Sequence, residues 1–253
     1  MPGPSAADQR LLGLLAEPPA TPRTAAGYLD LLGDSPAGPS TGITQRLMGV
    51  GAVAAVYEHW WRPALGRVAK GAGGPSMDEE VALAMELLCP NQGDTVLDVA
   101  CGTGRFTRAF AWHVGPEGLS VGLDGSRPML DRAVAADGPD TAVYLRGDAV
   151  TLPLRESSVD AVCCFAALHM FADPHAALDS FAATLRPGGR IALLTTARRS
   201  WEPARTVDTL GGIASGQRMF ERGEIAAELR ARGFTELDQT YAGVTQIVGA
   251  TLR

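Results

Sequence analysis

The chain contains, at residues 96–106, the segment Val96-Leu97-Asp98-Val99-Ala100-Cys101-Gly102-Thr103-Gly104-Arg105-Phe106. Its pattern indicates an apolar strand, a glycine-rich turn and the beginning of a helix. Gly102 and Gly104 let the backbone pass close to a ligand, because glycine has no side chain in the way. The helix that follows presents unpaired N–H groups at the same turn. The segment therefore predicts a site for a nucleotide-like ligand.

A glycine-rich turn of this kind also occurs in enzymes that bind NAD(P). Their fingerprint is G-x-G-x-x-G, in which the third glycine brings the helix close to its strand beside the pyrophosphate. In this chain the third position is Thr107. A bound dinucleotide would lack that close approach of the helix to its strand, so the sequence favours a different nucleotide-like ligand.

Acidic residues accompany three successive predicted strands. Asp98 lies near the end of the first, Asp124 follows Leu119–Leu123, and Asp148 follows Ala142–Arg146. The two oxygens of a carboxylate match a vicinal diol, so Asp124 is suited to ribose hydroxyls, and Asp148 can accept from an adenine amino group. Because open α/β folds bind ligands at the carboxyl ends of their strands, these acids are expected along one edge of the sheet.

From Met77 onward, helical and strand patterns alternate, which is typical of an α/β fold with helices on both faces of a parallel sheet. The predicted helices are Glu79–Cys89, Arg105–His113, Arg127–Ala136, His175–Thr184 and Arg222–Arg232. The predicted strands are Thr95–Ala100, Leu119–Leu123, Ala142–Arg146, Val159–Phe165, Arg190–Thr196, Phe234–Thr240 and Gly243–Leu252. The last two are joined by a short turn and must be antiparallel. The sequence thus predicts a doubly wound, seven-stranded sheet with an antiparallel C-terminal strand.

The first 75 residues are rich in Pro, Gly and Ala and predict a small, partly irregular N-terminal cap. Within it we expect a short apolar element at Gly27–Leu32 and a helix at Ile43–Trp61. The domain boundaries are therefore expected at 1–75 and 76–253. A linker is expected at Ala197–Arg218, and Pro187-Gly188-Gly189 indicates a turn.

Composition narrows the class of protein. A formal net charge of −6 argues against a nucleic-acid partner, because phosphate binding needs a clustered basic face. No apolar run approaches the roughly 18 residues of a membrane span, and the N-terminus lacks a secretory pattern, so we expect a cytoplasmic protein. The four cysteines have no CxxC spacing and predict neither a metal site nor a disulfide framework. A homodimer is compatible with this composition.

Taken together, these motifs resemble the class I S-adenosylmethionine (SAM)-dependent methyltransferases, in particular the small-molecule family that includes ubiquinone and menaquinone biosynthesis enzymes. The resemblance covers roughly residues 80 to 195. It rests on the segments Val96–Gly104, Gly122–Met129, Gly147–Pro153, Ser158–Val162, Leu168–Leu178 and Leu185–Arg190. The resemblance implies a Rossmann-like fold and SAM as the cofactor.

The resemblance also implies a set of cofactor contacts. Asp98, Gly102 and Gly104 would hold the methionine end of SAM, and Asp124 the ribose. Asp148 and Ala149 would hold the adenine, with Phe165 near the methyl group. The expected cofactor contacts also include Ala100, Gly125, Met129 and Gly147. Some relatives, among them certain ribosomal RNA methyltransferases, carry zinc-binding cysteines near the N-terminus. This chain has no cysteine before Cys89, which argues against a zinc site and an RNA substrate.

Methyl transfer from a sulfonium is an in-line displacement that depends mainly on positioning, and some acceptors also need a base. The candidate bases are His169 and His59, with Tyr57 as a weaker choice. The expected acceptor contacts are Tyr57, Trp61, His169, Met170 and Arg198. The aromatic residues could instead form a helical core stripe, His169 could make a structural hydrogen bond, and Arg198 could lie in a solvated loop.

The function predicted from the sequence is methyl transfer to O or C of a small apolar or aromatic molecule, of the quinone, lipid-like or polyketide type. Two alternatives stay open at this stage. One is an RNA methyltransferase, and the other is a SAM-binding protein that transfers no methyl group.

Overall fold

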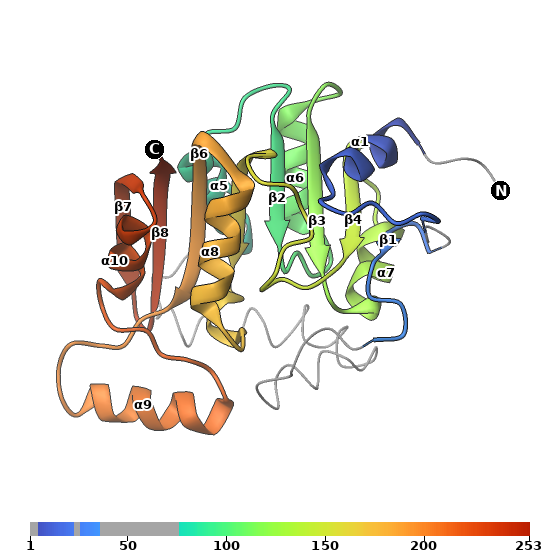
Figure 1. Ribbon diagram of the computed structural model, residues 1–253. Coiled ribbons are helices and arrows are strands. Elements are labelled where there is room, and N and C mark those ends of the chain that lie inside the picture. The colour runs from blue at the N-terminus through green and yellow to red at the C-terminus, as the bar shows by residue number, and fades with distance from the viewer. Residues whose placement is uncertain (1–4, 23–25, 36–75) are drawn as a thin grey trace.

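The computed structural model describes residues 5–22, 26–35 and 76–253, arranged as one mixed sheet with helices on both faces (Figure 1). The predicted helix Ile43–Trp61, with Tyr57, His59 and Trp61, lies outside the described residues. Among the described helices, none combines the length and the apolar character needed to cross a membrane.

The sheet in the described part of the chain has eight strands in the order β1-β4-β3-β2-β5-β6-β8-β7. The strands are β1 (Leu29–Asp30), β2 (Thr95–Val99), β3 (Leu119–Asp124), β4 (Ala142–Arg146), β5 (Val159–Phe165), β6 (Leu185–Thr196), β7 (Phe234–Ala242) and β8 (Thr245–Leu252). Strands β1 to β6 pair in parallel, and β8 runs antiparallel to both β6 and β7. The predicted doubly wound sheet and its antiparallel strand are confirmed.

The prediction of seven strands was wrong by one. The additional strand, β1, comes from the N-terminal stretch and pairs Leu29 with Leu145 and Asp30 with Arg146 at the edge of the sheet. A strand of two residues is too short to show an alternating pattern, and its pairing with β4 decides its structure.

The helices of the main domain are α5 (Met77–Leu88), α6 (Arg105–Val114), α7 (Arg127–Ala135), α8 (Pro174–Thr184), α9 (Ala204–Ser215) and α10 (Glu224–Ala231). Figure 1 shows α8 and α10 in front of the sheet and α5, α6 and α7 behind it. Two of these helices have sequence-encoded starts: Ser76 and Glu79 form a capping box at α5, and Asp173 caps α8 ahead of Pro174.

Strand β2 lies between two hydrophobic layers, and every one of its residues is buried. Leu97 and Val99 belong to the core that also contains residues of α8 and α10. Val96 belongs to the core formed with α5 and α6. Successive side chains of a strand point to opposite faces, so a strand covered by helices on both sides is apolar throughout. Asp98 is therefore an unusual residue for this position.

An N-terminal helix, α1 (Ala6–Leu14), was not predicted, because the surrounding Pro, Gly and Ala obscured its pattern. It begins with a capping box of Ser5 and Asp8, and Leu11 is buried in the core of the front face. Arg10 donates to the carbonyl oxygens of Glu117 and Gly118 at 2.8 Å each. The described residues before position 36 thus pack on the main sheet.

Two further local predictions were wrong. The expected linker Ala197–Arg218 contains helix α9, whose Gly211-Gly212 pair lowers its helix propensity and hides it in the sequence. The expected turn Pro187–Gly189 lies inside β6, where the pairing with β5 shifts register and Gly188 has a φ of +81°. Strand β6 consequently starts at Leu185, earlier than the predicted Arg190.

Candidate functional site

The glycine-rich turn joins the end of β2 to the start of α6. Three of its residues have left-handed backbone conformations: Ala100 with φ of +57°, Gly102 with φ of +56° and Gly104 with φ of +72°. A positive φ is costly for alanine, and such residues are concentrated at functional sites. The turn is held by a hydrogen bond from the Cys101 amide to the Leu123 carbonyl at 3.0 Å. It therefore lies directly against the end of β3.

The surroundings of the two glycines in the turn differ. A Cβ atom added at Gly102 would meet no atom within 4 Å, so this position faces open space. A Cβ atom at Gly104 would collide with the ring and hydroxyl of Tyr144 from β4. The sequence predicted a ligand contact at both positions, but the space above Gly104 is filled by Tyr144. Of the two, Gly102 leaves room for a ligand.

The end of β3 places Asp124 beside this turn. Its Oδ2 accepts from the Gly102 amide at 2.9 Å, and its Oδ1 accepts from the Ser126 amide at 2.8 Å. Burial raises the pKa of Asp124, and hydrogen bonds from the Ser126, Gly102 and Gly125 amides partly oppose that shift. Each carboxylate oxygen has two acceptor positions, so both oxygens can accept a further hydroxyl. This arrangement fits a vicinal diol.

Asp98 has a different environment. Its side chain is 3% exposed, and its Oδ2 accepts from the Thr107 hydroxyl of α6 at 2.6 Å. Thr107 occupies the position of the third glycine in the dinucleotide fingerprint. The residue that departs from the fingerprint thus donates a hydrogen bond to Asp98.

The end of β4 lies next to that of β3, with Asp124 paired to Arg146 in the register. The Gly147 amide donates to the Asp124 carbonyl at 3.3 Å, and Asp148 Oδ1 accepts from the Val150 amide at 2.9 Å. The Asp148 carboxylate therefore shapes its own turn. Because β2, β3 and β4 are adjacent parallel strands, the three acids lie along one edge of the sheet, as the sequence predicted.

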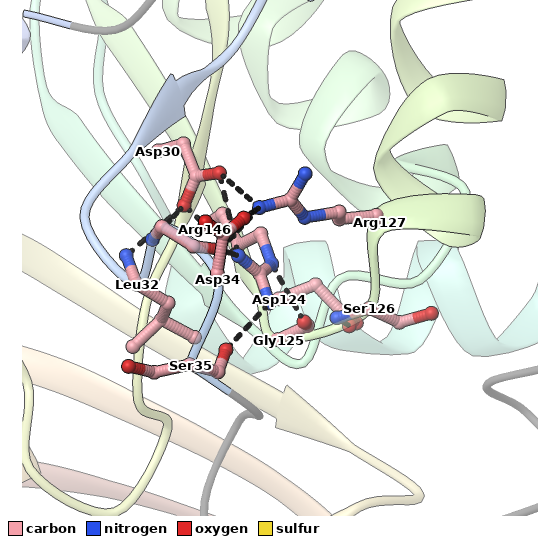
Figure 2. A network of polar contacts seen from close by, with 10 residues as sticks. Asp30, Leu32, Asp34, Ser35, Asp124, Gly125, Ser126, Arg127 and Arg146 are labelled. Carbon is pink, nitrogen blue, oxygen red and sulfur yellow. Dashed lines mark hydrogen bonds and ion pairs between the residues drawn. The ribbon is translucent and has the colours of Figure 1, made fainter.

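Sequence reasoning missed Arg146, the last residue of β4. Its buried guanidinium donates to the carboxylate of Asp30 at 3.0 and 3.3 Å and to the carbonyls of Gly33 at 2.6 Å, Ser35 at 3.1 Å and Gly125 at 3.1 Å (Figure 2). Burial would raise the pKa of Asp30, but hydrogen bonds from the Gly33 amide and Arg146 lower it overall. An arginine at the end of an otherwise apolar strand was the available signal.

The acceptor-side candidate His169 follows β5 in a single 3-10 turn, Leu168–Met170. Its Nδ1 lies 3.4 Å from the Thr195 hydroxyl at the end of β6, and its carbonyl accepts from the Arg218 amide at 2.9 Å. Burial lowers the pKa of His169 to about 4, so the imidazole is neutral at pH 7. Met170, in the same turn, is half-buried.

Two expected cofactor contacts have side chains in the core. The ring of Phe165 packs on Phe106 of α6, with ring centroids 5.2 Å apart. Met129 of α7 is 6% exposed. The ends of β5 and α7 hold these residues near the same edge of the sheet, but their side chains contribute to packing. Contact of Phe165 or Met129 with a cofactor stays a prediction.

Arg198 follows the end of β6 and is bound to an acidic partner. Its Nη1 lies 2.5 Å from Glu221 Oε1, and Arg205 donates to the same oxygen at 2.8 Å. Within the described residues, Arg198 Nε is buried without a hydrogen-bond partner. Two guanidinium groups thus share one carboxylate, which leaves a surplus positive charge. The alternative of a fully solvated loop does not describe Arg198, because its side chain is 22% exposed.

The described residues give no metal-binding arrangement. Across residues 5–22, 26–35 and 76–253, no three His, Cys, Asp or Glu side chains gather in a way that could hold a metal ion. All four cysteines are free thiols. Burial raises the pKa of the Cys101 and Cys163 thiols, which keeps them protonated and unreactive.

Comparison with known proteins shows what this chain is similar to. Residues 97–193 match the family described as a methyltransferase domain. An uncharacterized chloroplastic methyltransferase of Arabidopsis thaliana is 34% identical over 154 residues, which cover 58% of this chain and 42% of the relative. A demethylmenaquinone methyltransferase of Lactobacillus johnsonii is 34% identical over 123 residues, or 47% of this chain and 49% of the relative. The chain thus spans less than half the length of these relatives.

Structural similarity extends further along the chain. A SAM-dependent methyltransferase from Thermotoga maritima has a TM-score of 0.58 and 18% identity, and the match covers 82% of this chain and 99% of that one. At this identity the similarity concerns the fold. The chain therefore has a Rossmann-like fold shared with this solved SAM-dependent methyltransferase, and its residues 97–193 match the methyltransferase-domain family.

Proposed function

We propose that this chain is a SAM-dependent methyltransferase that acts on a small organic molecule. The observation that carries the proposal is the Asp124 carboxylate, which is oriented by the Gly102 and Ser126 amides beside an open turn. A partly buried carboxylate with acceptor positions left for hydroxyls suits the ribose diol of an adenosyl group. When bound, SAM would supply a methyl group on a positively charged sulfur, which is a good leaving group.

The remaining cofactor contacts are proposed for residues at the same edge of the sheet. Gly147, Asp148 and Ala149, after β4, would bind the adenine, while Gly125 and Met129 flank the ribose. Asp98, Ala100 and the turn at Gly102 and Gly104 would hold the methionine end. Gly104 takes part through its backbone, because Tyr144 fills the space beside it.

The acceptor would lie near the ends of β5 and β6, beside His169, Met170 and Arg198. His169 would meet the acceptor as a neutral imidazole, which can donate or accept a hydrogen bond and take up a proton. Tyr57, His59 and Trp61 complete the proposed acceptor set. The boundary at residue 75 stays a prediction; within the described residues, β1 and Leu11 of α1 belong to the sheet and core of the main domain.

For the acceptor itself, we propose a quinone, a lipid-like molecule or a polyketide-type molecule, methylated at O or C. The name of the Lactobacillus relative, a demethylmenaquinone methyltransferase, supports a quinone-like acceptor. The net charge of −6 favours a small molecule over RNA. We further propose that the protein acts in the cytoplasm, and a homodimer is consistent with the proposal.

Two measurements test the function. Calorimetric titration with S-adenosylhomocysteine, the demethylated cofactor, should show binding, and titration with NAD should not. Incubation with methyl-labelled SAM and a host extract should place label in a product that partitions into organic solvent. Label in RNA would favour the RNA alternative, and binding without any labelled product would favour a SAM-binding protein without methyl transfer. Uptake of NAD in place of S-adenosylhomocysteine would refute the proposal.

A further inference from the structure

Arg146 joins two segments that are distant in the sequence. All three guanidinium nitrogens are used: Nε donates to the Gly125 carbonyl, Nη1 to Asp30 and Gly33, and Nη2 to the Ser35 carbonyl. Figure 2 shows the guanidinium between the N-terminal turn and the turn after β3. The Arg146 side chain is 6% exposed, so these bonds form out of contact with bulk water.

One side of this junction is the proposed ribose site. Gly125, whose carbonyl accepts from Arg146, lies between Asp124 and Ser126. The Ser126 amide is one of the backbone donors that orient the Asp124 carboxylate. Fixing the Gly125 carbonyl limits rotation of the backbone on both sides of it. The direction of the Asp124 carboxylate therefore depends on the Arg146 guanidinium.

The other side is a turn of the N-terminal segment, defined here as residues 30–35. Asp30 Oδ1 accepts from the Leu32 amide at 3.0 Å and the Gly33 amide at 2.9 Å, which folds the turn. The folded turn aims the Gly33 and Ser35 carbonyls at Arg146. The Asp30 side chain is 13% exposed, so its charge and that of Arg146 neutralise each other in a largely buried site.

We propose that Arg146 is a positioning residue for the cofactor, and that docking of residues 30–35 and binding of SAM are coupled through its guanidinium. The inference rests on the proposed function. Because the Arg146 side chain bonds to both segments, an ordered turn at residues 30–35 favours an ordered Asp124 site, and an ordered Asp124 site favours the ordered turn. A coupling of this kind is reciprocal, so the cofactor should also stabilise the docked N-terminal segment.

Arg127 provides a contrast, because it touches the same segment from outside. It pairs with Asp30 at 3.2 Å and Asp34 at 3.6 Å, but its side chain is 46% exposed. Exposed ion pairs contribute little free energy. Arg146 alone of the two donates a hydrogen bond to Gly125.

The test compares Arg146→Lys with Arg10→Lys. Lysine at 146 keeps a positive charge beside Asp30 but cannot reach Gly125, Gly33 and Ser35 together. Arg10 fastens α1 to the Glu117 and Gly118 carbonyls, before β3 begins, and serves as the matched control. Calorimetry on variants shown to be folded by circular dichroism should give S-adenosylhomocysteine affinity about tenfold weaker for Arg146→Lys and unchanged for Arg10→Lys.

A second readout follows the coupling itself. The Leu32 and Gly33 amides bond to Asp30, and their hydrogen exchange reports the docked turn. S-adenosylhomocysteine should slow their exchange in the wild-type chain, and the slowing should be lost in Arg146→Lys. If Arg146→Lys does not fold, Asp30→Asn carries the test, with an affinity loss of about threefold expected.

The outcomes separate the two proposals. A wild-type chain that binds S-adenosylhomocysteine, together with a folded Arg146→Lys variant of equal affinity and equal slowing of exchange, overturns the positioning role and leaves the proposed function standing. A wild-type chain that does not bind S-adenosylhomocysteine overturns the proposed function itself.

Discussion

The amide nitrogen of Gly102 lies 2.9 Å from Oδ2 of Asp124, so the turn after β2 and the end of β3 form one unit. The Ser126 amide bonds the other oxygen at 2.8 Å. Backbone donors thus fix the orientation of this partly buried carboxylate before any ligand arrives. Preorganisation of this kind reduces the entropy lost on binding.

Replacing Asp124 should weaken cofactor binding strongly. In Asp124→Ala the ribose loses a charged acceptor, and we expect S-adenosylhomocysteine binding to weaken by about 2 kcal/mol, or roughly 30-fold. Calorimetry measures the effect. The control is Asp131→Asn on the exposed side of α7, which should bind as the wild type does. Unchanged affinity in Asp124→Ala would remove this residue from the site.

The two glycines of the turn should respond differently to alanine. Gly104→Ala brings a methyl group into Tyr144 and adds left-handed strain, so we expect a loss of about 3 kcal/mol in the free energy of unfolding. Gly102→Ala also adds left-handed strain, but its methyl group would meet open space. We therefore expect it to lower the free energy of unfolding by about 1 kcal/mol and to weaken cofactor binding. Urea unfolding and calorimetry on both variants decide the matter. Equal losses of stability would show that Tyr144 does not fill the space beside Gly104.

His169 should make stability depend on pH. Burial lowers its folded-state pKa from 6.5 to about 4, so the unfolded chain binds the proton more readily between these values. The stability that the neutral His169 imidazole contributes is fully present above pH 6.5 and is lost as the pH falls toward 4. We expect a loss of about 2 kcal/mol between pH 7 and pH 5. Urea unfolding of the wild type and of His169→Gln at both pH values measures this loss of stability, because the variant should not show it. Parallel curves for the two proteins would contradict the buried, neutral imidazole.

The ion pair of Arg199 and Asp208 should hold helix α9 in place. Asp208 is 6% exposed and receives the guanidinium at 2.6 Å as well as the Arg199 amide at 2.9 Å. Because Arg199 is about one-third exposed, we expect Asp208→Asn to cost about 2 kcal/mol, less than a fully buried pair would. Thermal unfolding measures the loss. Asp179→Asn, which disrupts the more exposed contact with Arg232, is the control and should change stability by less than about 0.5 kcal/mol.

The central strands could be predicted because their signal is local. Strands β4 and β5 have the bounds expected from the sequence, since each is a mostly apolar run of five to seven residues. The sequence indicated a short apolar element at Gly27–Leu32 but not that two of its residues, β1, add to the sheet, and the Gly211-Gly212 pair masked α9.

The same distinction applies to the site. The sequence placed Asp124 and Asp148 correctly at one edge, because parallel strands end together. It could not reveal that Arg146 pairs with Asp30, 116 residues away, since that contact depends on how β1 adds to the sheet. Nor could it show that Tyr144 lies over Gly104, which depends on the order of the strands.

The contact of Gly104 with Tyr144 also bears on redesign of this turn. A larger residue at 104 needs a smaller one at 144, so the two positions should be varied as a pair in any combinatorial library. Because Tyr144 also receives a hydrogen bond from Arg108, a third position limits which pairs are tolerated. A change to the glycine-rich turn at position 104 therefore requires a repacking of β4 beside it.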